Sequence, residues 1–172
     1  PRMKAAITCT QHDPEKDFHV ALIQMVNLMR GGEPVAMSTR SGEFVTLREV
    51  LDDVGTDAAR YMFLSRKSDS PLDFDLDLVK QRNMENPVYY VQYAHARVAA
   101  LLRRAADRGV VLPEHSTPDM LKVLTSADDL ALLREAERFR NVVEDAARAR
   151  AAHPVSFYLM ELSGRLPSYY AN

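Results

Sequence analysis

The sequence has little of what several protein classes require. Its single cysteine, Cys9, excludes an internal disulfide and any metal site made of clustered cysteines. This usage is typical of a reducing compartment, so we expect a cytoplasmic protein. No apolar run reaches the roughly 18–20 residues that a membrane-spanning helix needs, and no membrane partner is expected. The chain opens without the hydrophobic segment of a signal peptide and without an initiator methionine, which indicates a fragment.

The net charge is also small, and the sequence contains no complete metal-binding motif. The formal net charge is -2, so any nucleic-acid role must depend on a local basic patch. Asp73, Asp75 and Asp77 alternate as metal ligands can, but no glycine turn or closing glutamate completes a calcium loop. We expect these aspartates to cap a helix or to make contacts at a junction. No protein-bound metal is expected.

What the sequence does contain is a β-hairpin near its start. Residues 20–29 form a short apolar run bounded by turn residues, which predicts a buried strand. Gly31 and Gly32 suit a tight turn because glycine readily adopts positive φ, and residues 35–37 return as the partner strand. We predict no other β-structure in the chain.

After the hairpin the pattern is helical. Thr46 and Glu49 form a capping box at the start of a helix that Gly55 ends, and a second helix follows at once. Residues 65–77 are charged and irregular, and we place a domain junction there. Beyond it the pattern predicts four further helices, over about residues 86–108, from Thr117, over about residues 127–151 and from Pro154. The expected fold is mainly α: a small β-hairpin remnant of an α/β domain, followed by an α-helical bundle.

The helix over residues 86–108 has two distinct faces at about 100° per residue. The predicted core face collects Val88, Val91, His95, Val98, Leu102 and Ala105. A stripe away from that core collects Tyr90, Tyr93, Arg97, Arg104 and Arg108. Tyrosine rings can stack on unpaired bases and guanidinium groups can hold phosphates, so this stripe is typical of a nucleic-acid contact. The stripe also fits a domain contact, and His95 is expected to be structural rather than catalytic.

Several motifs, in their order along the chain, resemble one family. Ala-Met-Ser-Thr-Arg-Ser-Gly (36–42) and Gly-Thr-Asp-Ala-Ala-Arg-Tyr (55–61) resemble the end of a class I aminoacyl-tRNA synthetase catalytic domain. Leu-Asp-Phe-Asp-Leu-Asp-Leu (72–78) and Glu-Asn-Pro-Val-Tyr-Tyr-Val-Gln-Tyr-Ala-His-Ala-Arg (85–97) are similar to arginyl-tRNA synthetases of the bacterial type. For residues 1–77 the resemblance implies the C-terminal part of a Rossmann-type catalytic domain, with the signature loop and connecting helices. For residues 78–172 it implies a helical anticodon-binding domain that is truncated at its C-terminus.

The resemblance also implies an ATP site. Met37, Ser38, Thr39 and Arg40 take the place of the second signature loop of the family, Lys-Met-Ser-Lys-Ser or Lys-Met-Ser-Lys-Arg, which closes over ATP and its Mg2+. Thr39 stands where the functional lysine usually lies, which removes a cation that stabilises the transition state, and Arg40 is the nearest substitute. The first lysine is likewise replaced, by Ala36. Gln24 and Met25 fall at positions that bind adenine through the backbone in family members.

The tRNA contacts implied by the resemblance lie in the helical part. Tyr90 and Tyr93 match positions that contact the anticodon loop, Tyr170 matches a third, and Arg97 belongs to the same motif. Arg104 and Arg108 are added from the helical stripe alone. The sequence thus predicts one tRNA-binding face on the helix over residues 86–108.

The expected function is that of an arginine–tRNA ligase, which activates arginine with ATP and transfers it to the 3′ end of tRNA. The first signature motif and the arginine-binding residues are not in this chain, so we expect catalysis only from the longer enzyme, which we expect to be a monomer. Two alternatives stay open. One is a class I synthetase for another amino acid; the other is a non-catalytic RNA-binding module, which Ala36 and Thr39 favour.

Overall fold

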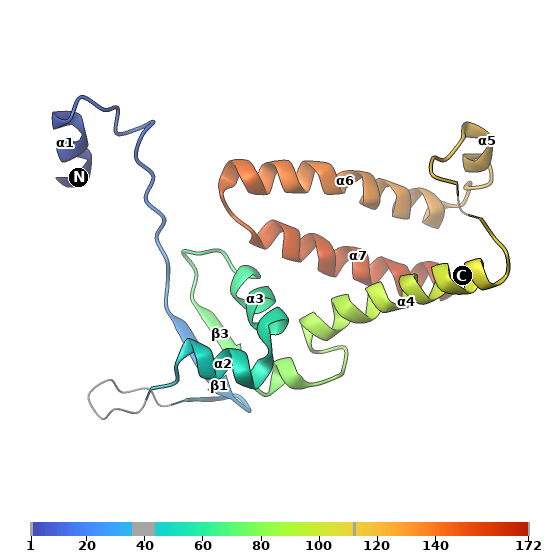
Figure 1. Cartoon of the computed structure of the whole chain (residues 1–172), viewed down its shortest axis with the longest axis horizontal. Helices are drawn as coiled ribbons and strands as arrows, with labels where there is room; N and C mark the ends of the chain where they lie inside the picture. Colours follow the sequence, from blue (N-terminus) through green and yellow to red (C-terminus); the bar gives the residue numbers. More distant parts are fainter. Residues whose placement is uncertain (1, 36–43, 112, 172) are drawn as a thin grey trace.

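The computed structural model describes residues 2–35, 44–111 and 113–171, and of residues 168, 170 and 171 it describes the backbone only. Figure 1 shows a short N-terminal helix on an extended arm, a small sheet with two helices beside it, and a group of long helices. The prediction of a mainly α protein with a small β element is therefore confirmed.

The N-terminal arm differs from its prediction. Helix α1 (Arg2–Cys9) is followed by an arm that leads to strand β1 (Val26–Arg30), so the predicted strand over residues 20–29 forms only in its second half. On the arm, Ile23 and Met25 are 80% and 76% exposed. Their apolar character predicted burial, but no element in the described part of the chain covers them.

The sheet has three strands in the order β2-β1-β3. Strand β1 pairs antiparallel with β2 (Glu33–Pro34) through the predicted glycine turn, where Gly31 and Gly32 have φ values of 60° and 84°. Residue Val35 extends this pairing, because its N–H donates to the carbonyl of Leu28 at 2.8 Å. Residues 36 and 37 of the predicted partner strand lie outside the described residues.

The third strand contradicts the prediction that the hairpin is the only β-structure. Strand β3 (Leu72–Asp75) pairs in parallel with β1. Leu72, Phe74 and Leu76 are buried and alternate with aspartates, which is the period-2 pattern of a half-buried strand. The charges alone predict irregular structure, whereas the alternation of apolar and acidic residues indicates the strand.

The two helices after the hairpin agree with their predictions. Helix α2 (Leu47–Val54) starts at the capping box: the hydroxyl of Thr46 accepts the Glu49 N–H, and the Glu49 carboxylate accepts the Thr46 N–H at 2.7 Å. Hydrogen bonds from Thr46 lower the pKa of Glu49, and the bond from the Thr46 backbone has a larger effect than the bond from its side chain. Gly55, at φ 84°, ends α2 and precedes α3 (Thr56–Leu64), whose Ala59 side chain is fully buried.

The remaining helices form a bundle after the short 3-10 helix η1 (Leu78–Lys80). They are α4 (Pro87–Asp107), α5 (Pro118–Leu121), α6 (Ala127–Ala149) and α7 (His153–Ala171). Helix α7 packs on both α6 and α4, so it lies between them (Figure 1). None of the described helices combines the length and apolarity needed to cross a membrane.

The hydrophobic core crosses the position where the sequence placed the domain boundary. Leu76, before residue 78, and Val79 and Val88, after it, belong to one buried cluster. Helix α3 also contacts α7 directly, where the Tyr61 hydroxyl donates to the Ser156 carbonyl at 3.4 Å. Burial raises the pKa of Tyr61. The division into residues 1–77 and 78–172 therefore stays a proposal, with the two parts sharing a packed junction.

Candidate nucleic-acid interface

Helix α4 begins at a buried asparagine whose hydrogen bonds are all made. Asn86 is 3% exposed, and its side-chain oxygen accepts the N–H groups of Val88 and Tyr89 at 3.0 and 3.4 Å. Its amide nitrogen donates to the carbonyls of Val79 and Gln81 at 2.8 and 2.7 Å. The first pair caps the helix and the second ties it to η1. Asn86 therefore fixes the rotation of α4, and with it the direction in which the tyrosines point.

Three side chains form a continuous column along the start of α4. The rings of Tyr89 and Tyr93 stack with centroids 6.0 Å apart and planes 20° apart. The Arg97 guanidinium lies 5.7 Å from the Tyr93 ring centroid and donates to its hydroxyl at 3.2 Å. Residues four apart share one face of a helix, so this column is built by local spacing alone. We name Tyr89, Tyr93 and Arg97 the aromatic column; sequence reasoning missed Tyr89.

Tyr90 does not belong to this column, contrary to the prediction that it lies off the core face. It is half-buried, and its hydroxyl lies next to Gly164 of α7: a Cβ built on that glycine would be 3.2 Å from the oxygen. Tyr90 therefore packs at the α4–α7 interface. The error comes from the predicted core face, because α7 covers α4 on the side of Tyr90 and Ala94 rather than on the side of His95, which is exposed.

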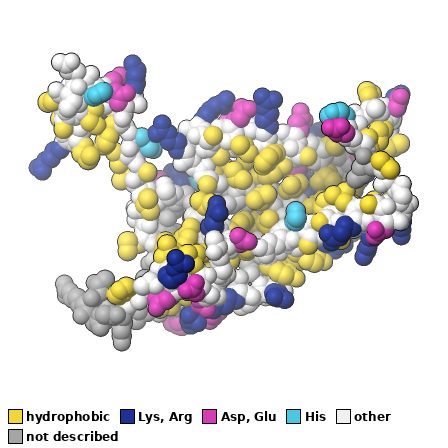
Figure 2. All heavy atoms as spheres, viewed as in Figure 1, with side chains coloured by type: hydrophobic (Ala, Val, Ile, Leu, Met, Phe, Trp, Pro, Cys, Tyr) yellow, Lys and Arg dark blue, Asp and Glu magenta, His cyan; other side chains and the backbone are white. Residues whose placement is uncertain are grey.

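The basic part of the predicted stripe lies at the far end of α4. Arg104 and Arg108 are exposed there, and basic side chains gather at this end of the helix in Figure 2. At about 1.5 Å per residue, Arg108 lies roughly 28 Å along the axis from Tyr89. Stacking rings at one end and cations at the other suit a single-stranded RNA loop, which offers both unpaired bases and phosphates.

Helix α7, which supports the interface, is held to α6 by a buried carboxylate. Glu135 has a side chain only 5% exposed, and its Oε2 pairs with Arg165 at 3.2 Å. Its Oε1 lies 3.4 Å from Arg138, an ion pair without hydrogen-bond geometry. The Glu135 carbonyl accepts the Tyr158 hydroxyl at 2.9 Å, and burial and then the Glu135 charge raise the pKa of Tyr158. These contacts fix the helix against which Tyr90 packs.

Asp75, at the end of β3, holds the hairpin turn, which agrees with the prediction that these aspartates make contacts at a junction. Asp75 accepts the N–H groups of Gly31 and Gly32 at 3.3 and 2.8 Å and those of Asp77 and Leu78 at 2.9 and 3.2 Å. Burial pushes the pKa of Asp75 upward, but the four N–H donors outweigh it and hold that pKa below its usual value. Within the described residues, no group of three or more His, Cys, Asp or Glu side chains could hold a metal ion.

The predicted ATP-binding residues are described only in part. Met37, Ser38, Thr39 and Arg40 lie outside the described residues, as does the side chain of Tyr170. Gln24 and Met25 lie on the arm before β1, where the Gln24 N–H donates to Ser68 at 2.8 Å and the Met25 carbonyl accepts from Leu72 at 3.3 Å. Two of their backbone groups thus pair within the chain, and the described residues do not assemble an ATP site.

Comparison with known proteins agrees with this arrangement. Residues 91–172 match the model of the DALR anticodon binding domain family. Over 171 residues the chain is 60% identical to the arginine–tRNA ligase of Desulfovibrio desulfuricans, a match that covers 99% of this chain and 31% of that protein. It is 56% identical over 170 residues to the arginine–tRNA ligase of Syntrophotalea carbinolica. The chain therefore spans about a third of the length of the curated relatives it matches.

Two solved structures have the same fold. An arginyl-tRNA synthetase from Campylobacter jejuni superposes with a TM-score of 0.81 at 35% identity, over 99% of this chain and 36% of that one. The arginyl-tRNA synthetase of Thermus thermophilus superposes with a TM-score of 0.59 over 87% of this chain, and at 22% identity it shows a shared fold alone.

Proposed function

From the homology of nearly the whole chain to part of the arginine–tRNA ligases, we propose that it belongs to an enzyme that activates arginine with ATP and transfers it to the 3′ end of tRNA. In this proposal the chain supplies the anticodon-binding helices and the signature loop that precedes them in the sequence. The rest of the enzyme supplies the arginine site. The proposed enzyme is cytoplasmic and acts as a monomer.

The structural observation that carries the tRNA-binding part of the proposal is the aromatic column at the start of α4. Tyr93 presents a half-buried ring that stacks on Tyr89 and accepts a hydrogen bond from Arg97 at its hydroxyl. A column fixed in this way loses little conformational entropy when a base stacks on its end, so stacking contributes most of its energy to binding. The column lies at the edge of the segment that matches the anticodon binding domain, residues 91–172. We therefore assign the anticodon loop to this face.

For the ATP half of the reaction, the proposal keeps the residues that the sequence indicated. The hairpin whose turn Asp75 holds ends at Pro34, and residues 35 and 36 separate it from the loop residues Met37, Ser38, Thr39 and Arg40. A fixed hairpin suits a loop that must return to the same place over the triphosphate and its Mg2+. Arg40 supplies the positive charge that Thr39 lacks. Gln24 and Met25 are proposed to meet the adenine through those backbone groups that do not pair with residues 68–72.

The alternative of a non-catalytic RNA-binding module rests on Ala36 and Thr39, which replace two cations of the signature loop. It shares the aromatic column with the main proposal and differs only in catalysis. A synthetase for another amino acid would share both the aromatic column and the signature loop with the main proposal, because neither is proposed to contact the amino-acid side chain.

One assay separates the three candidates. The full-length enzyme that contains this chain is incubated with ATP, total tRNA and each amino acid in turn. Charging with arginine alone supports the proposal, and charging with a different amino acid replaces the substrate while keeping the reaction. If folded enzyme binds tRNA but charges it with nothing, the non-catalytic module is correct.

A further inference from the structure

We propose that the cleft at the start of α4 binds the ribose-phosphate backbone of a nucleotide adjoining the base stacked on the aromatic column. This inference rests on the proposed function and extends its RNA-binding site. The cleft has a volume of about 480 Å3 and lies where the α2–α3 turn, the end of η1 and the start of α4 meet. Its lining comes from residues 54–58, from residues 79–82 and from Asn86, Val88, Tyr89 and Gln92.

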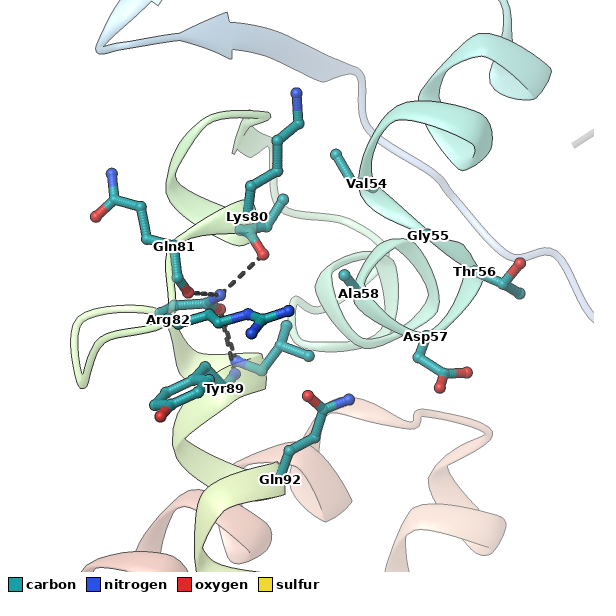
Figure 3. Close-up of a pocket in the computed structure, with 13 residues that line it drawn as sticks. Val54, Gly55, Thr56, Asp57, Ala58, Lys80, Gln81, Arg82, Tyr89 and Gln92 are labelled. Carbon is teal, nitrogen blue, oxygen red and sulfur yellow. Dashed lines mark hydrogen bonds between the residues drawn. The ribbon is translucent and has the colours of Figure 1, made fainter.

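The positive charge in the cleft comes from Arg82. Lys80 is the other cation in the lining, but its ammonium pairs with Asp53 at 2.6 Å and points away from the cleft (Figure 3). Arg82 is exposed and makes no ion pair or side-chain hydrogen bond within the described part of the chain, and its side chain extends across the cleft toward α3 (Figure 3). A guanidinium placed in this way can hold a phosphate by two parallel hydrogen bonds.

The other polar groups of the cleft complement a ribose. Asp57 and Gln92 lie on two different walls, α3 and α4, and neither makes a side-chain hydrogen bond or ion pair within the described residues. A ribose 2′-hydroxyl both donates and accepts hydrogen bonds, so it suits a carboxylate and an amide together. Free phosphate would be repelled by Asp57, whereas a ribose-phosphate places its donor near the carboxylate and its anion near Arg82. The chemistry therefore favours an RNA strand.

The cleft adjoins the aromatic column, which indicates which RNA segment it would bind. Tyr89 belongs to both sites: it lines the cleft, and its ring stacks on Tyr93. A base stacked on the Tyr89 end of the column would therefore lie next to the cleft. The ribose-phosphate of the adjoining nucleotide would then face the cleft, which Tyr89 and Arg82 both line. The cleft accordingly takes part of the same anticodon arm.

The test measures binding of an RNA hairpin with the anticodon-arm sequence of an arginine-accepting tRNA to the full-length enzyme. Arg82→Gln should weaken binding about 5- to 20-fold at low salt and reduce the slope of log affinity against log salt by about 0.7, the value for one phosphate on a single strand. Arg82→Lys should keep that slope. The matched control is Arg134→Gln on α6, an exposed arginine with no side-chain partner in the described residues, and it should bind as the wild type does.

A second measurement tests the ribose contact. The wild-type enzyme should bind the RNA hairpin more tightly than a hairpin with a deoxyribose backbone, and Asp57→Ala should narrow this difference. Unchanged hairpin affinity and salt slope in Arg82→Gln would overturn the cleft proposal, as would unchanged sugar discrimination in Asp57→Ala. If the wild type does not bind the hairpin at all, the proposed function fails instead, so the two failures are distinguishable.

Discussion

Replacing Asn86 tests whether one buried side chain sets the position of the interface. Asn86→Ala removes the helix cap, which costs about 1 kcal/mol, and leaves the carbonyls of Val79 and Gln81 without their donor. Only the bond to Val79 is fully buried, and one unmet buried acceptor costs about 1–3 kcal/mol, so the total loss of unfolding free energy should be about 2–4 kcal/mol. With a urea m-value of about 2 kcal/mol/M, the midpoint should fall by about 1–2 M.

The conservative change Asn86→Asp separates the loss of the helix cap from the loss of the two hydrogen bonds that Asn86 donates. An aspartate keeps the cap, but at neutral pH it places a carboxylate oxygen against the two carbonyls that Asn86 now donates to, at 2.8 and 2.7 Å. The protonated acid can donate to one of them, so its folded-state pKa should be raised above about 3.9, the unfolded value. Its stabilisation is then fully present below the unfolded pKa and is lost as the pH rises through the folded one.

The assay is urea unfolding of the chain followed by helical circular dichroism, at neutral and at mildly acidic pH. Asn141→Ala is the control, because Asn141 is exposed on α6 and its loss should change stability by less than about 0.5 kcal/mol. The deficit of Asn86→Asp relative to wild type should shrink in acid. Wild-type stability of Asn86→Asp at neutral pH, or a deficit that grows in acid, would refute the reasoning.

Three further predictions follow from other contacts. Tyr93→Ala in the full-length enzyme should raise KM for tRNA about tenfold or more, because stacking on an aromatic ring contributes about 1–3 kcal/mol per base. Tyr93→Phe should keep most of the stacking energy and therefore a KM near that of the wild type. An unchanged KM in Tyr93→Ala would contradict the role of the aromatic column. Gly164→Ala should leave the urea midpoint nearly unchanged, because the helix gain of about 1 kcal/mol is offset by the 3.2 Å contact with the Tyr90 hydroxyl, and the gain should emerge in a Tyr90→Phe background. Asp75→Asn should be less stable than wild type at neutral pH. Because the folded-state pKa of Asp75 is lowered, its contribution to stability is present above the unfolded-state pKa and is lost as the pH falls through the folded-state pKa. The stability deficit of the variant should therefore close in acid, and a deficit that does not change with pH would argue against the hairpin contacts.

Local signals in the sequence were enough for most of the helices and for the family resemblance. The capping box at Thr46, the glycine at residue 55 and the Thr117-Pro118 start each act through neighbouring residues, and each is present in the structure. The glycine hairpin turn is local in the same sense and also forms. The pairing of Tyr93 with Arg97 follows from helical spacing, whereas the predicted stripe contains Tyr90 in place of Tyr89.

What depended on distant segments could not be read from such signals. Which side of α4 is buried was decided by where α7 lies, and the glycine at residue 164 that admits Tyr90 is more than seventy residues away along the chain. Strand β3 needs β1, and the exposed arm before β1 shows that apolar residues are buried only where another element covers them. The cleft at Arg82 likewise exists only because the α2–α3 turn, η1 and α4 meet. Helix starts and turns are set by near neighbours, whereas buried faces and clefts are set by which surfaces meet.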